Sequence, residues 1–435
     1  MNNYFGKIAE YGCIAEHLGH SFSGEIHHLL GKALSNDDQP CYHYVLQELT
    51  PDEVGPFLER RAFRGINVTI PYKQTVIPYL DELTDAARSI GAVNTIVNRN
   101  GHLIGDNTDF FGMKYLLSLI GIDLKNKKVL ILGTGGTSNT AYAVATHDGA
   151  REVYKVSRQA KDGCLTYDDL KDHLDAEVII NTTPLGMYPN DEGCPLPADV
   201  SLSDFKQLCG VFDAIYHPLR TELVSAAMAI GIPATGGLPM LVAQAAAATE
   251  RFLDCRVSND IVAKVCDAVE AQKQNIVLIG MPASGKTTIG RLLSAKLNMP
   301  LIDTDEEFLA TTGMSAGDYI VTYGESAFRE VEARVIAEMI APLNGVIVAT
   351  GGGAILRDEN VHRLKRNGKL VFLDRSLASL ETTPDRPLTS DCELLRRCYE
   401  ERYDRYCSVA DERLSIPDGE SPENSMDRII KNGEK

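Results

Sequence analysis

The clearest chemical signature in this sequence of 435 residues is the stretch Gly280-Met-Pro-Ala-Ser-Gly-Lys-Thr287, which matches the pattern G-x-x-x-x-G-K-T. A short apolar run precedes it and a helical pattern follows it, which is the context of a phosphate-binding loop. Its glycines would let backbone N–H groups converge on phosphate oxygens at the positive end of a helix. Lys286 could then reach the β- and γ-phosphates, and the Thr287 hydroxyl could bind Mg²⁺. We therefore expect a nucleotide site rather than a turn that is merely rich in glycine.

Two carboxylates follow this loop, and their spacing suggests a shared role. Asp303 and Asp305 are two residues apart in a short predicted strand, residues 300–305. Side chains two apart in a strand point to the same side. One carboxylate could support Mg²⁺ through water, and the other could accept a hydrogen bond from a substrate hydroxyl. The alternative is a strand-end turn that only caps the next helix.

An arginine and three glycines come next in this half of the chain. Arg329 and Glu332 are three residues apart on one face of a predicted helix. Such a pair is usually solvated, but the carboxylate could instead hold the arginine in place. The predicted strand 346–349 ends near Gly351-Gly-Gly353, and glycines at a strand end allow a ligand to approach the backbone closely.

A second glycine-rich loop, Gly133-Thr-Gly-Gly-Thr-Ser138, follows the predicted strand 128–132 and precedes a helix that should end near Thr146. This is the dinucleotide-binding pattern with a small residue, Ser138, in place of the third glycine. The next strand, 152–156, leads to Arg158, where an NAD site would need a carboxylate for the ribose 2′-hydroxyl. An arginine favours a 2′-phosphate and therefore NADP, unless Arg158 is only a surface residue.

The first part of the chain carries further candidate groups. Ser21 and Ser23 could both donate hydrogen bonds to one carboxylate, or they could simply cap a helix over residues 24–34. Lys73 follows a buried strand and Pro71, which we expect to start a helix. In its first turn, Lys73 could donate a proton or bind substrate, or it could be an exposed lysine.

The elements that must position these groups alternate between apolar, β-branched runs and helical patterns, which is typical of an α/β protein. The length allows two or three domains, and the net charge of −17 disfavours nucleic acid as a main partner. We see no secretory signal, and the most apolar stretch, 226–249, is interrupted by glycines and prolines, so we expect no membrane span. The ten cysteines lack metal-site spacing and predict reduced thiols in a cytoplasmic protein.

Residues 1–270 resemble shikimate dehydrogenase. The resemblance rests on motifs in the same order: His20-Ser-x-Ser23, Asn67-Val-Thr-Ile-Pro-Tyr-Lys73, Gly91-Ala-Val-Asn-Thr95, Asn107-Thr-Asp109, the glycine loop at 133, Asn181-Thr-Thr-Pro, Asp213-x-x-Tyr216 and Met240-Leu-Val-Ala-Gln244. It implies NADPH-dependent reduction of 3-dehydroshikimate to shikimate, with Lys73 and Asp109 as the catalytic pair. The implied substrate contacts are Ser21, Ser23, Thr69, Asn94, Tyr216 and Gln244. The implied cofactor contacts are Gly133, Gly135, Gly136, Ser138, Arg158 and Gly237.

Residues 275–415 resemble shikimate kinase, which implies transfer of a phosphoryl group from ATP to shikimate with Mg²⁺. Arg329 and Arg402 correspond to the arginines that bind the substrate carboxylate, and Asp305 to the aspartate that meets its ring hydroxyls, with Gly352 and Gly353 lining the pocket. Lys286, Asp305 and Arg386, the last from the family's lid, would be the catalytic residues. The implied nucleotide contacts are Ala283, Ser284, Gly285, Thr287 and Thr288, and the implied metal contacts are Thr287 and Asp303.

This second half also departs from the family at two places. The stretch 379–385 has no arginine before Arg386, and no arginine follows Ala410 with the spacing of the family's adenine-side residue. These departures affect the nucleotide side of the site.

Together the two resemblances predict a bifunctional enzyme that makes shikimate and then phosphorylates its 3-hydroxyl. We expect an α/β substrate domain over residues 1–112 and 238–272, a Rossmann NADP domain over 113–237, and a P-loop kinase domain over 275–435. Alternatives are a preference for quinate or NAD, a regulatory nucleotide-binding module in the second half, and a kinase for another small alcohol. The oligomeric state does not follow from the sequence.

Overall fold

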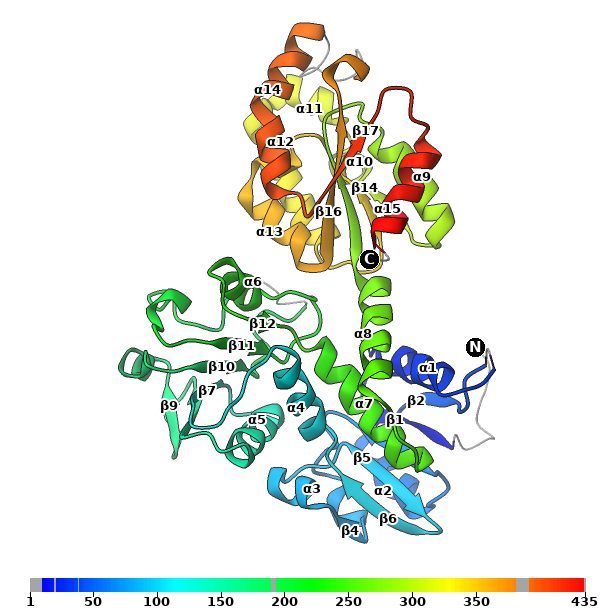
Figure 1. Ribbon diagram of the computed structural model, residues 1–435, viewed down its shortest axis with the longest axis vertical. Coiled ribbons are helices and arrows are strands. Elements are labelled where there is room, and N and C mark those ends of the chain that lie inside the picture. The colour runs from blue at the N-terminus through cyan, green and yellow to red at the C-terminus, as the bar shows by residue number, and fades with distance from the viewer. Residues whose placement is uncertain (1–9, 19–20, 38, 189–192, 381–390, 434–435) are drawn as a thin grey trace. The chain divides into compact units, whose positions relative to one another are not determined.

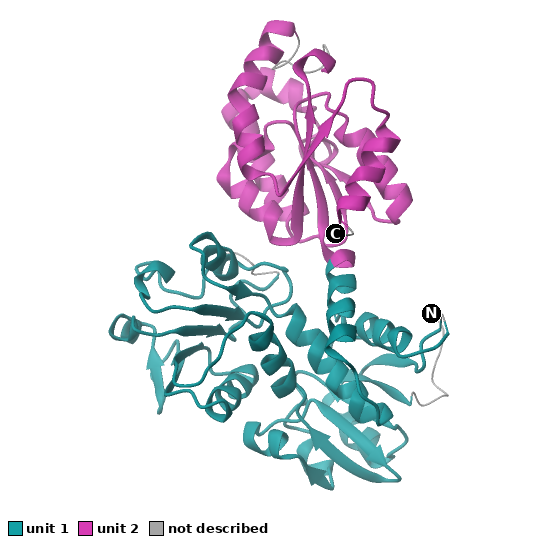
Figure 2. Ribbon diagram, in the orientation of Figure 1, with its two compact units in different colours: residues 1–270 teal, residues 271–435 magenta. Residues whose placement is uncertain are grey.

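The computed structural model describes residues 10–18, 21–37, 39–188, 193–380 and 391–433. The chain forms two compact units, residues 1–270 and 271–435, and the change falls inside helix α8 (Asn259–Lys273) (Figure 2). Each unit packs helices against largely parallel sheets, so the predicted α/β class is confirmed.

The first sheet of unit 1 is mixed, with the strand order β2-β1-β3-β5-β6-β4 (Figure 1). β1 runs parallel to β2 and β3, whereas β5 is antiparallel to β3 and β6. This arrangement brings the ends of β3 and β6, which precede Lys73 and Asp109, to one side of the sheet. The strands are β1 (Tyr11–Ala15), β2 (Tyr44–Glu48), β3 (Gly65–Val68), β4 (Glu82–Leu83), β5 (Thr95–Arg99) and β6 (His102–Asp106), and the helices α1 (Ser23–Ala33), α2 (Pro51–Glu59) and α3 (Asp85–Ile90).

The second sheet of unit 1 is fully parallel, with the order β12-β11-β10-β7-β8-β9. Its central strand β7 is buried along its whole length, as expected for an apolar strand covered on both faces. Strands lead away from β7 in both directions, which creates the switch point where α/β sheets bind ligands. The strands are β7 (Lys128–Leu132), β8 (Glu152–Ser157), β9 (Cys164–Thr166), β10 (Val178–Asn181), β11 (Gly210–Asp213) and β12 (Ala234–Thr235), and the helices α4 (Asp109–Leu119), α5 (Gly136–His147) and α6 (Glu222–Ala229).

Helix α7 (Leu238–Leu253) returns the chain from the second sheet to the first. It packs closely on α4, because a Cβ atom at Gly112 would lie 2.6 Å from the carbonyl oxygen of Met240. At its other end Phe252 fills the space beside Gly65 of β3, where an added Cβ would lie 2.2 Å from the ring. The helix therefore holds β3 and α4 in a fixed arrangement.

Unit 2 contains one parallel sheet of five strands with the order β14-β15-β13-β16-β17. The central strand β13 leads directly into the phosphate-loop motif, with β14 and β15 on one side and β16 and β17 on the other. The strands are β13 (Asn275–Ile279), β14 (Leu301–Asp303), β15 (Ile347–Ala349), β16 (Gly368–Arg375) and β17 (Glu412–Ile416), and the helices α9 (Lys286–Leu297), α10 (Thr304–Thr312), α11 (Ala316–Tyr323), α12 (Glu325–Val335), α13 (Asp358–Asn367), α14 (Cys392–Val409) and α15 (Pro422–Gly433).

Two local predictions were wrong. No α-helix starts at Pro71; residues 70–76 form successive turns before a short 3-10 helix, Ile77–Tyr79. Pro78 has no backbone N–H to donate to the carbonyl oxygen of Gln74, so an α-helix that began at Pro71 could not continue through it. The strand expected over 300–305 ends at Asp303, whose carboxylate caps α10 by accepting from the backbone N of Asp305 at 3.0 Å.

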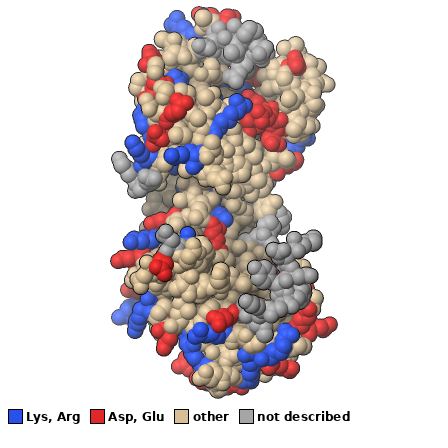
Figure 3. Space-filling model, turned by 90° about the vertical axis from the view of Figure 1, so that its right-hand side faces the viewer, with Lys and Arg blue, Asp and Glu red and all other residues tan. Residues whose placement is uncertain are grey.

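The surface agrees with an acidic protein. Acidic and basic side chains are interspersed on the face shown in Figure 3, and the net charge of the chain is −17. None of the helices in the described ranges has the length and hydropathy needed to cross a membrane.

Candidate active sites

Lys73 and Asp109 form an ion pair in unit 1, with 2.6 Å between Nζ and Oδ2. The lysine lies in the turns after β3, and the aspartate is the first residue of α4. Their side chains are 26% and 15% exposed, so a ligand can reach both groups. The structure thus brings together the pair that the sequence motifs suggested, and Lys73 is not a solvated surface lysine.

Asn94 fixes the other side of the Asp109 carboxylate. Its Nδ2 donates to Asp109 Oδ1 at 2.9 Å, and its Oδ1 accepts from the backbone N of Thr108 at 2.7 Å. Asn67 Nδ2 donates to the carbonyl oxygen of Asn94 at 3.2 Å, and Tyr44 Oη donates to Asn67 Oδ1 at 2.6 Å. A chain of buried hydrogen bonds therefore leads from β2 to the carboxylate and orients it.

Gln244 is a second amide, and it is hydrogen-bonded to the residue that precedes Asp109. It lies on α7, and its Oε1 accepts from Thr108 Oγ1 at 3.4 Å while its Nε2 donates to the carbonyl oxygen of Leu241 at 2.9 Å. The contact with Thr108 places Gln244 one residue from Asp109. Asn94 therefore contacts the ion pair directly, whereas Gln244 contacts the neighbouring residue Thr108.

The segment Ser21–Ser23, called the serine loop below, lies against Tyr216 through Phe22. The Phe22 ring packs at a tilt of 60° against the Tyr216 ring, with centroids 5.2 Å apart, and burial raises the pKa of this tyrosine. Phe22, and not Ser21 or Ser23, is the N-cap residue of α1, and its side chain makes no cap hydrogen bond. The Ser21 hydroxyl instead accepts from the backbone N of Ser23 at 3.3 Å. Thr69, half-buried after β3, is held by a bond from its backbone N to the carbonyl oxygen of Ile14 at 3.1 Å.

A cavity of about 890 Å³ lies at the carboxyl ends of β7, β8 and β10. Gly133, with φ +108°, lets the loop pass close to Thr182, whose Oγ1 would lie 2.8 Å from an added Cβ. Ser138 is buried and its hydroxyl donates to the carbonyl oxygen of Gly135 at 2.6 Å, which closes the first turn of α5. The residues that line the cavity are Gly133, Thr134, Gly135, Val156, Ser157, Arg158, Gln159, Tyr167, Thr182, Thr183, Pro184, Leu185, Cys194, Pro195, Leu196 and Pro197.

Three of the proposed cofactor contacts, Arg158, Gly136 and Gly237, differ in how they lie relative to this cavity. Arg158 is exposed, as expected for a surface residue, and it also lines the cavity, as expected for a cofactor contact. At Gly136, an added Cβ would meet nothing within 4 Å, which leaves its backbone accessible. Gly237 does not line the cavity; it packs at the start of α7, where an added Cβ would lie 2.2 Å from the carbonyl oxygen of Ala214.

The carboxyl end of β11 carries a buried carboxylate, Asp213. Its Oδ1 accepts from Asn181 Nδ2 and from the backbone N of Ile215, both at 3.0 Å, and its Oδ2 accepts from Thr221 Oγ1 at 2.7 Å. Burial raises the pKa of Asp213 to about 6, although these hydrogen bonds oppose the rise. This carboxylate holds the segment that leads to Tyr216.

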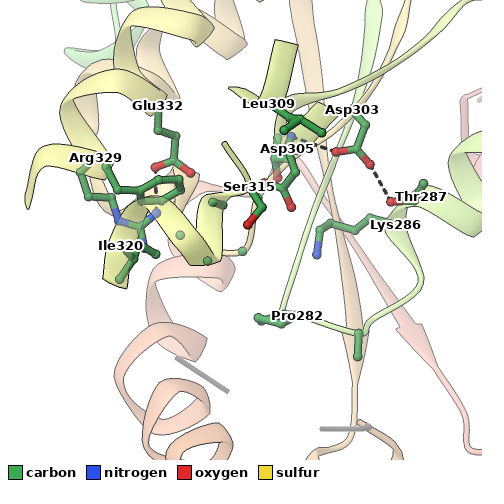
Figure 4. Close-up of a pocket in the computed structure, with 18 of the residues that line it drawn as sticks. Pro282, Lys286, Thr287, Asp303, Asp305, Leu309, Ser315, Ile320, Arg329 and Glu332 are labelled. Carbon is green, nitrogen blue, oxygen red and sulfur yellow. Dashed lines mark hydrogen bonds and ion pairs between the residues drawn. The ribbon is translucent and has the colours of Figure 1, made fainter. Parts of the chain in front are cut away.

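The second cavity, of about 620 Å³, lies wholly within unit 2 (Figure 4). Lys286 and Thr287 project from the phosphate loop, and Arg329 with Glu332 face it from α12. The cavity is therefore lined both by the phosphate loop and by two arginines from other elements, Arg329 and Arg402. Its lining includes Ala283, Gly285, Lys286, Thr287, Thr288, Asp303, Asp305, Arg329, Glu332, Gly351, Gly352, Gly353 and Arg402.

The phosphate loop is pre-shaped by its own contacts. Lys286 Nζ donates to the carbonyl oxygens of Gly280 and Met281, each at 2.9 Å, which places the ammonium group inside the loop. Thr287 Oγ1 donates to Asp303 Oδ2 at 2.7 Å. A hydroxyl and a carboxylate side by side are hard oxygen ligands of the kind Mg²⁺ takes beside nucleotide phosphates, so these residues fit that ion.

Arg329 is held rigidly rather than solvated. Its Nη1 donates to Glu332 Oε2 at 2.8 Å and its Nη2 to Glu325 Oε1 at 3.0 Å, and only 10% of its side chain is exposed. Burial raises the pKa of Glu332, against the opposing effect of Arg329, and its Oε1 has no hydrogen-bond partner among the residues that the structure describes. Gly353 leaves room for the guanidinium, since an added Cβ would lie 2.1 Å from Nη2.

Arg402 approaches the same cavity from α14. Its Nη1 donates to the carbonyl oxygen of Gly352 at 3.4 Å, and Tyr406, one turn later, donates to the carbonyl oxygens of Gly280 and Gly352. Tyr406 thus joins the phosphate loop to the segment Gly351–Gly353, a role that the sequence motifs did not predict. Its four-residue spacing from Arg402 on one helix was the available signal. Arg386, proposed as a catalytic residue, lies outside the described residues.

These features define a class of protein: a dinucleotide-linked dehydrogenase joined to a P-loop kinase of a small molecule. A family model described as the shikimate dehydrogenase substrate binding domain matches residues 13–96, and one described as shikimate kinase matches residues 282–433. The chain belongs to the shikimate dehydrogenase family over its first unit and carries a shikimate kinase domain in its second.

Individual relatives agree with this assignment. The NADP⁺-dependent shikimate dehydrogenase of Clostridium beijerinckii is 34% identical over 263 residues, which cover 58% of this chain and 94% of that protein. The corresponding protein of Halothermothrix orenii is 38% identical over 54% of this chain and 87% of its own length. A crystal structure of a chorismate mutase/shikimate 5-dehydrogenase fusion from Clostridium acetobutylicum has 33% identity and a TM-score of 0.55, over 60% of this chain and 96% of that one. The Thermus thermophilus enzyme in complex with NADP(H) and shikimate has 26% identity and a TM-score of 0.53, with coverages of 60% and 99%.

Proposed function

We propose that unit 1 reduces 3-dehydroshikimate to shikimate with NADPH, and that unit 2 phosphorylates the 3-hydroxyl of shikimate with ATP and Mg²⁺. The observation that carries the proposal is that two separately built sites lie in units matched by two different family models, and both of those families are named for shikimate enzymes. One site contains the Lys73–Asp109 pair, and the other gathers Lys286, Asp305 and Arg329 around one cavity.

In the first reaction, NADPH supplies the hydride. The ketone oxygen then becomes an alkoxide, which needs a proton donor within hydrogen-bond reach. Lys73 provides that proton, and Asp109 holds the ammonium group in place through the contact of 2.6 Å. Asn94 fixes the second carboxylate oxygen, so that Asp109 cannot rotate away from the lysine.

The carboxylate of the substrate has a separate binding place. We propose that Ser21, Ser23 and Tyr216 bind it, because the serine loop packs on Tyr216 through Phe22. Thr69, Asn94 and Gln244 then bind the ring hydroxyls. Arg158, at the rim of the cofactor cavity, faces the 2′-phosphate that distinguishes NADP from NAD.

The second reaction depends on positioning and charge. Lys286 and the backbone of the phosphate loop bind the β- and γ-phosphates, and Arg329 with Arg402 binds the shikimate carboxylate. Asp305, between them in the cavity, accepts a hydrogen bond from the 3-hydroxyl and orients its oxygen toward the γ-phosphate. Arg386 would stabilise the charge of the transferring group.

Coupled turnover tests the proposal. The purified protein, supplied with 3-dehydroshikimate, NADPH, ATP and Mg²⁺, should produce shikimate 3-phosphate, detected by mass spectrometry. Accumulation of shikimate without its phosphate would refute the kinase half. Initial rates with NADP against NAD, and with shikimate against quinate, separate the alternative dehydrogenase specificities. We also propose a cytoplasmic location, which fits the ten cysteines, all of them free thiols.

A further inference from the structure

Beside the phosphate loop, outside the lining of the kinase cavity, lies an arginine that the sequence motifs did not single out, Arg375. It is the last residue of β16, which lies beside the strand that leads into the phosphate loop. Its Nε donates to the carbonyl oxygen of Ser284 at 3.1 Å. Its Nη2 lies 4.0 Å from the place of an added Cβ on Gly285. The guanidinium therefore rests against the phosphate loop at its turn into α9.

The remaining N–H groups of this guanidinium are not used within the described part of the chain. Only Nε of Arg375 has a hydrogen-bond partner there, so the Nη1 and Nη2 groups are available for a ligand. The neighbouring acidic groups are already engaged: Asp374 pairs with Arg413 at 2.8 Å, and Asp418 accepts from Ser376 Oγ at 2.8 Å. A buried or half-buried guanidinium with unused donors beside a phosphate loop is suited to bind an anion.

The sheet order indicates which part of the nucleotide reaches this position. Asp303 ends β14 and Asp305 follows it, and Gly351–Gly353 follow β15, so the groups that meet the acceptor lie on one side of the central strand β13. β16 lies on the opposite side. A nucleotide whose γ-phosphate points toward the acceptor must extend its α-phosphate and nucleoside away from it, toward β16.

We infer that Arg375 binds the α-phosphate of ATP and so contributes to nucleotide affinity in the kinase site, an inference that rests on the proposed function. The contact with Ser284 and Gly285 places the guanidinium at the phosphates rather than at the base. It supplies a positive charge on the nucleotide side of a site whose sequence lacks an arginine over residues 379–385 before Arg386.

Calorimetric titration of the full-length protein with MgATP and with magnesium tripolyphosphate tests this inference. Arg375→Ala should raise the Kd of both ligands by roughly tenfold or more, the effect of losing a charge-assisted hydrogen bond. Arg375→Gln, which can still donate to the Ser284 carbonyl oxygen, should be impaired as strongly, and Arg375→Lys less. The matched control is Lys369→Ala on the same strand, which removes a cation paired with Glu412 at 2.8 Å and should leave both Kd values unchanged.

Unchanged affinity for both ligands in Arg375→Ala would overturn the inference. Wild-type affinity in Arg375→Gln would also overturn it, because the arginine would then only anchor the loop. Weaker binding of ATP with normal binding of tripolyphosphate would overturn it as well, because the arginine would then contact the nucleoside. The dehydrogenase activity of the same chain and the KM for shikimate report whether each variant is folded. A wild-type protein that fails to bind MgATP would instead refute the proposed kinase function itself.

Discussion

At the scale of single residues, the Lys73–Asp109 pair separates the two activities most sharply. Asp109→Asn keeps the size of the side chain but removes the charge that holds the ammonium group at 2.6 Å. Because positioned proton transfer contributes about 10²–10⁴-fold, kcat for shikimate oxidation should fall by at least about a hundredfold. Phosphorylation of shikimate by the same preparation should change less than about twofold, since Asp109 does not line the kinase cavity.

A second ion pair in unit 1 provides the control for this variant. Lys114 and Asp148 lie 2.7 Å apart on α4 and after α5, outside the motifs assigned to substrate or cofactor. Asp148→Asn removes a charge from a similar pair and should keep nearly full dehydrogenase activity. If Asp109→Asn retained more than a tenth of the wild-type kcat, the pair would not be the proton-transfer centre.

At the scale of elements, the sequence predicted strands and helices well where apolar periodicity was strong. The predicted strand 128–132 and the helix expected to end near Thr146 match β7 and α5 within a few residues. The errors at Pro71 and Asp305 arose where a local side chain overrides periodicity. A second proline blocked one helix, and an aspartate N-cap ended one strand early.

The contacts around the site were harder to predict, because they join elements that are distant in sequence. Asn67 is buried in β3 and hydrogen-bonded to Tyr44 and Asn94, two partners that lie on other strands or loops and that the sequence does not indicate. Similarly, nothing near Arg375 in sequence indicates that it reaches Ser284, since the two are 91 residues apart. Only the parallel pairing of β13 with β16 brings them together.

Asp213, at the end of β11, should make the stability of unit 1 depend on pH. Its pKa is raised from 3.8 to about 6, so the folded protein binds the proton more tightly than the unfolded chain. The stabilising contribution is therefore complete below about pH 4 and is lost as the pH rises through 6. In Asp213→Asn the amide can donate to Thr221, and this dependence should disappear.

The measurement is the urea concentration at which half of the dehydrogenase activity is lost, compared between pH 5 and pH 7 for the two proteins. The wild type should lose stability relative to the variant as the pH rises, by up to about 3 kcal/mol over the full transition. Subtracting the stability of the variant from that of the wild type removes the contribution of every titrating group that the two proteins share. A constant difference across this range would show that the carboxyl titrates elsewhere.

At the scale of the whole molecule, two active sites share one chain, but each cavity is lined only by residues of its own unit. The shikimate made in unit 1 can therefore pass through solution before it binds in unit 2. Lys73→Ala should abolish reduction and spare phosphorylation, and Arg329→Ala should do the reverse, because each residue serves one site. Each variant's remaining activity shows that its chain has folded.

An equimolar mixture of these two variants should then convert 3-dehydroshikimate to shikimate 3-phosphate. Quenched-flow sampling should show free shikimate rising first and the phosphate following after a lag. When the concentrations of intact sites are matched, the wild type and the mixture should have the same lag, because a freely diffusing intermediate does not depend on which chain made it. An excess of the Lys73→Ala variant can be added to trap free shikimate. If the wild type still had a clearly shorter lag than the mixture, the intermediate would pass between the units without release.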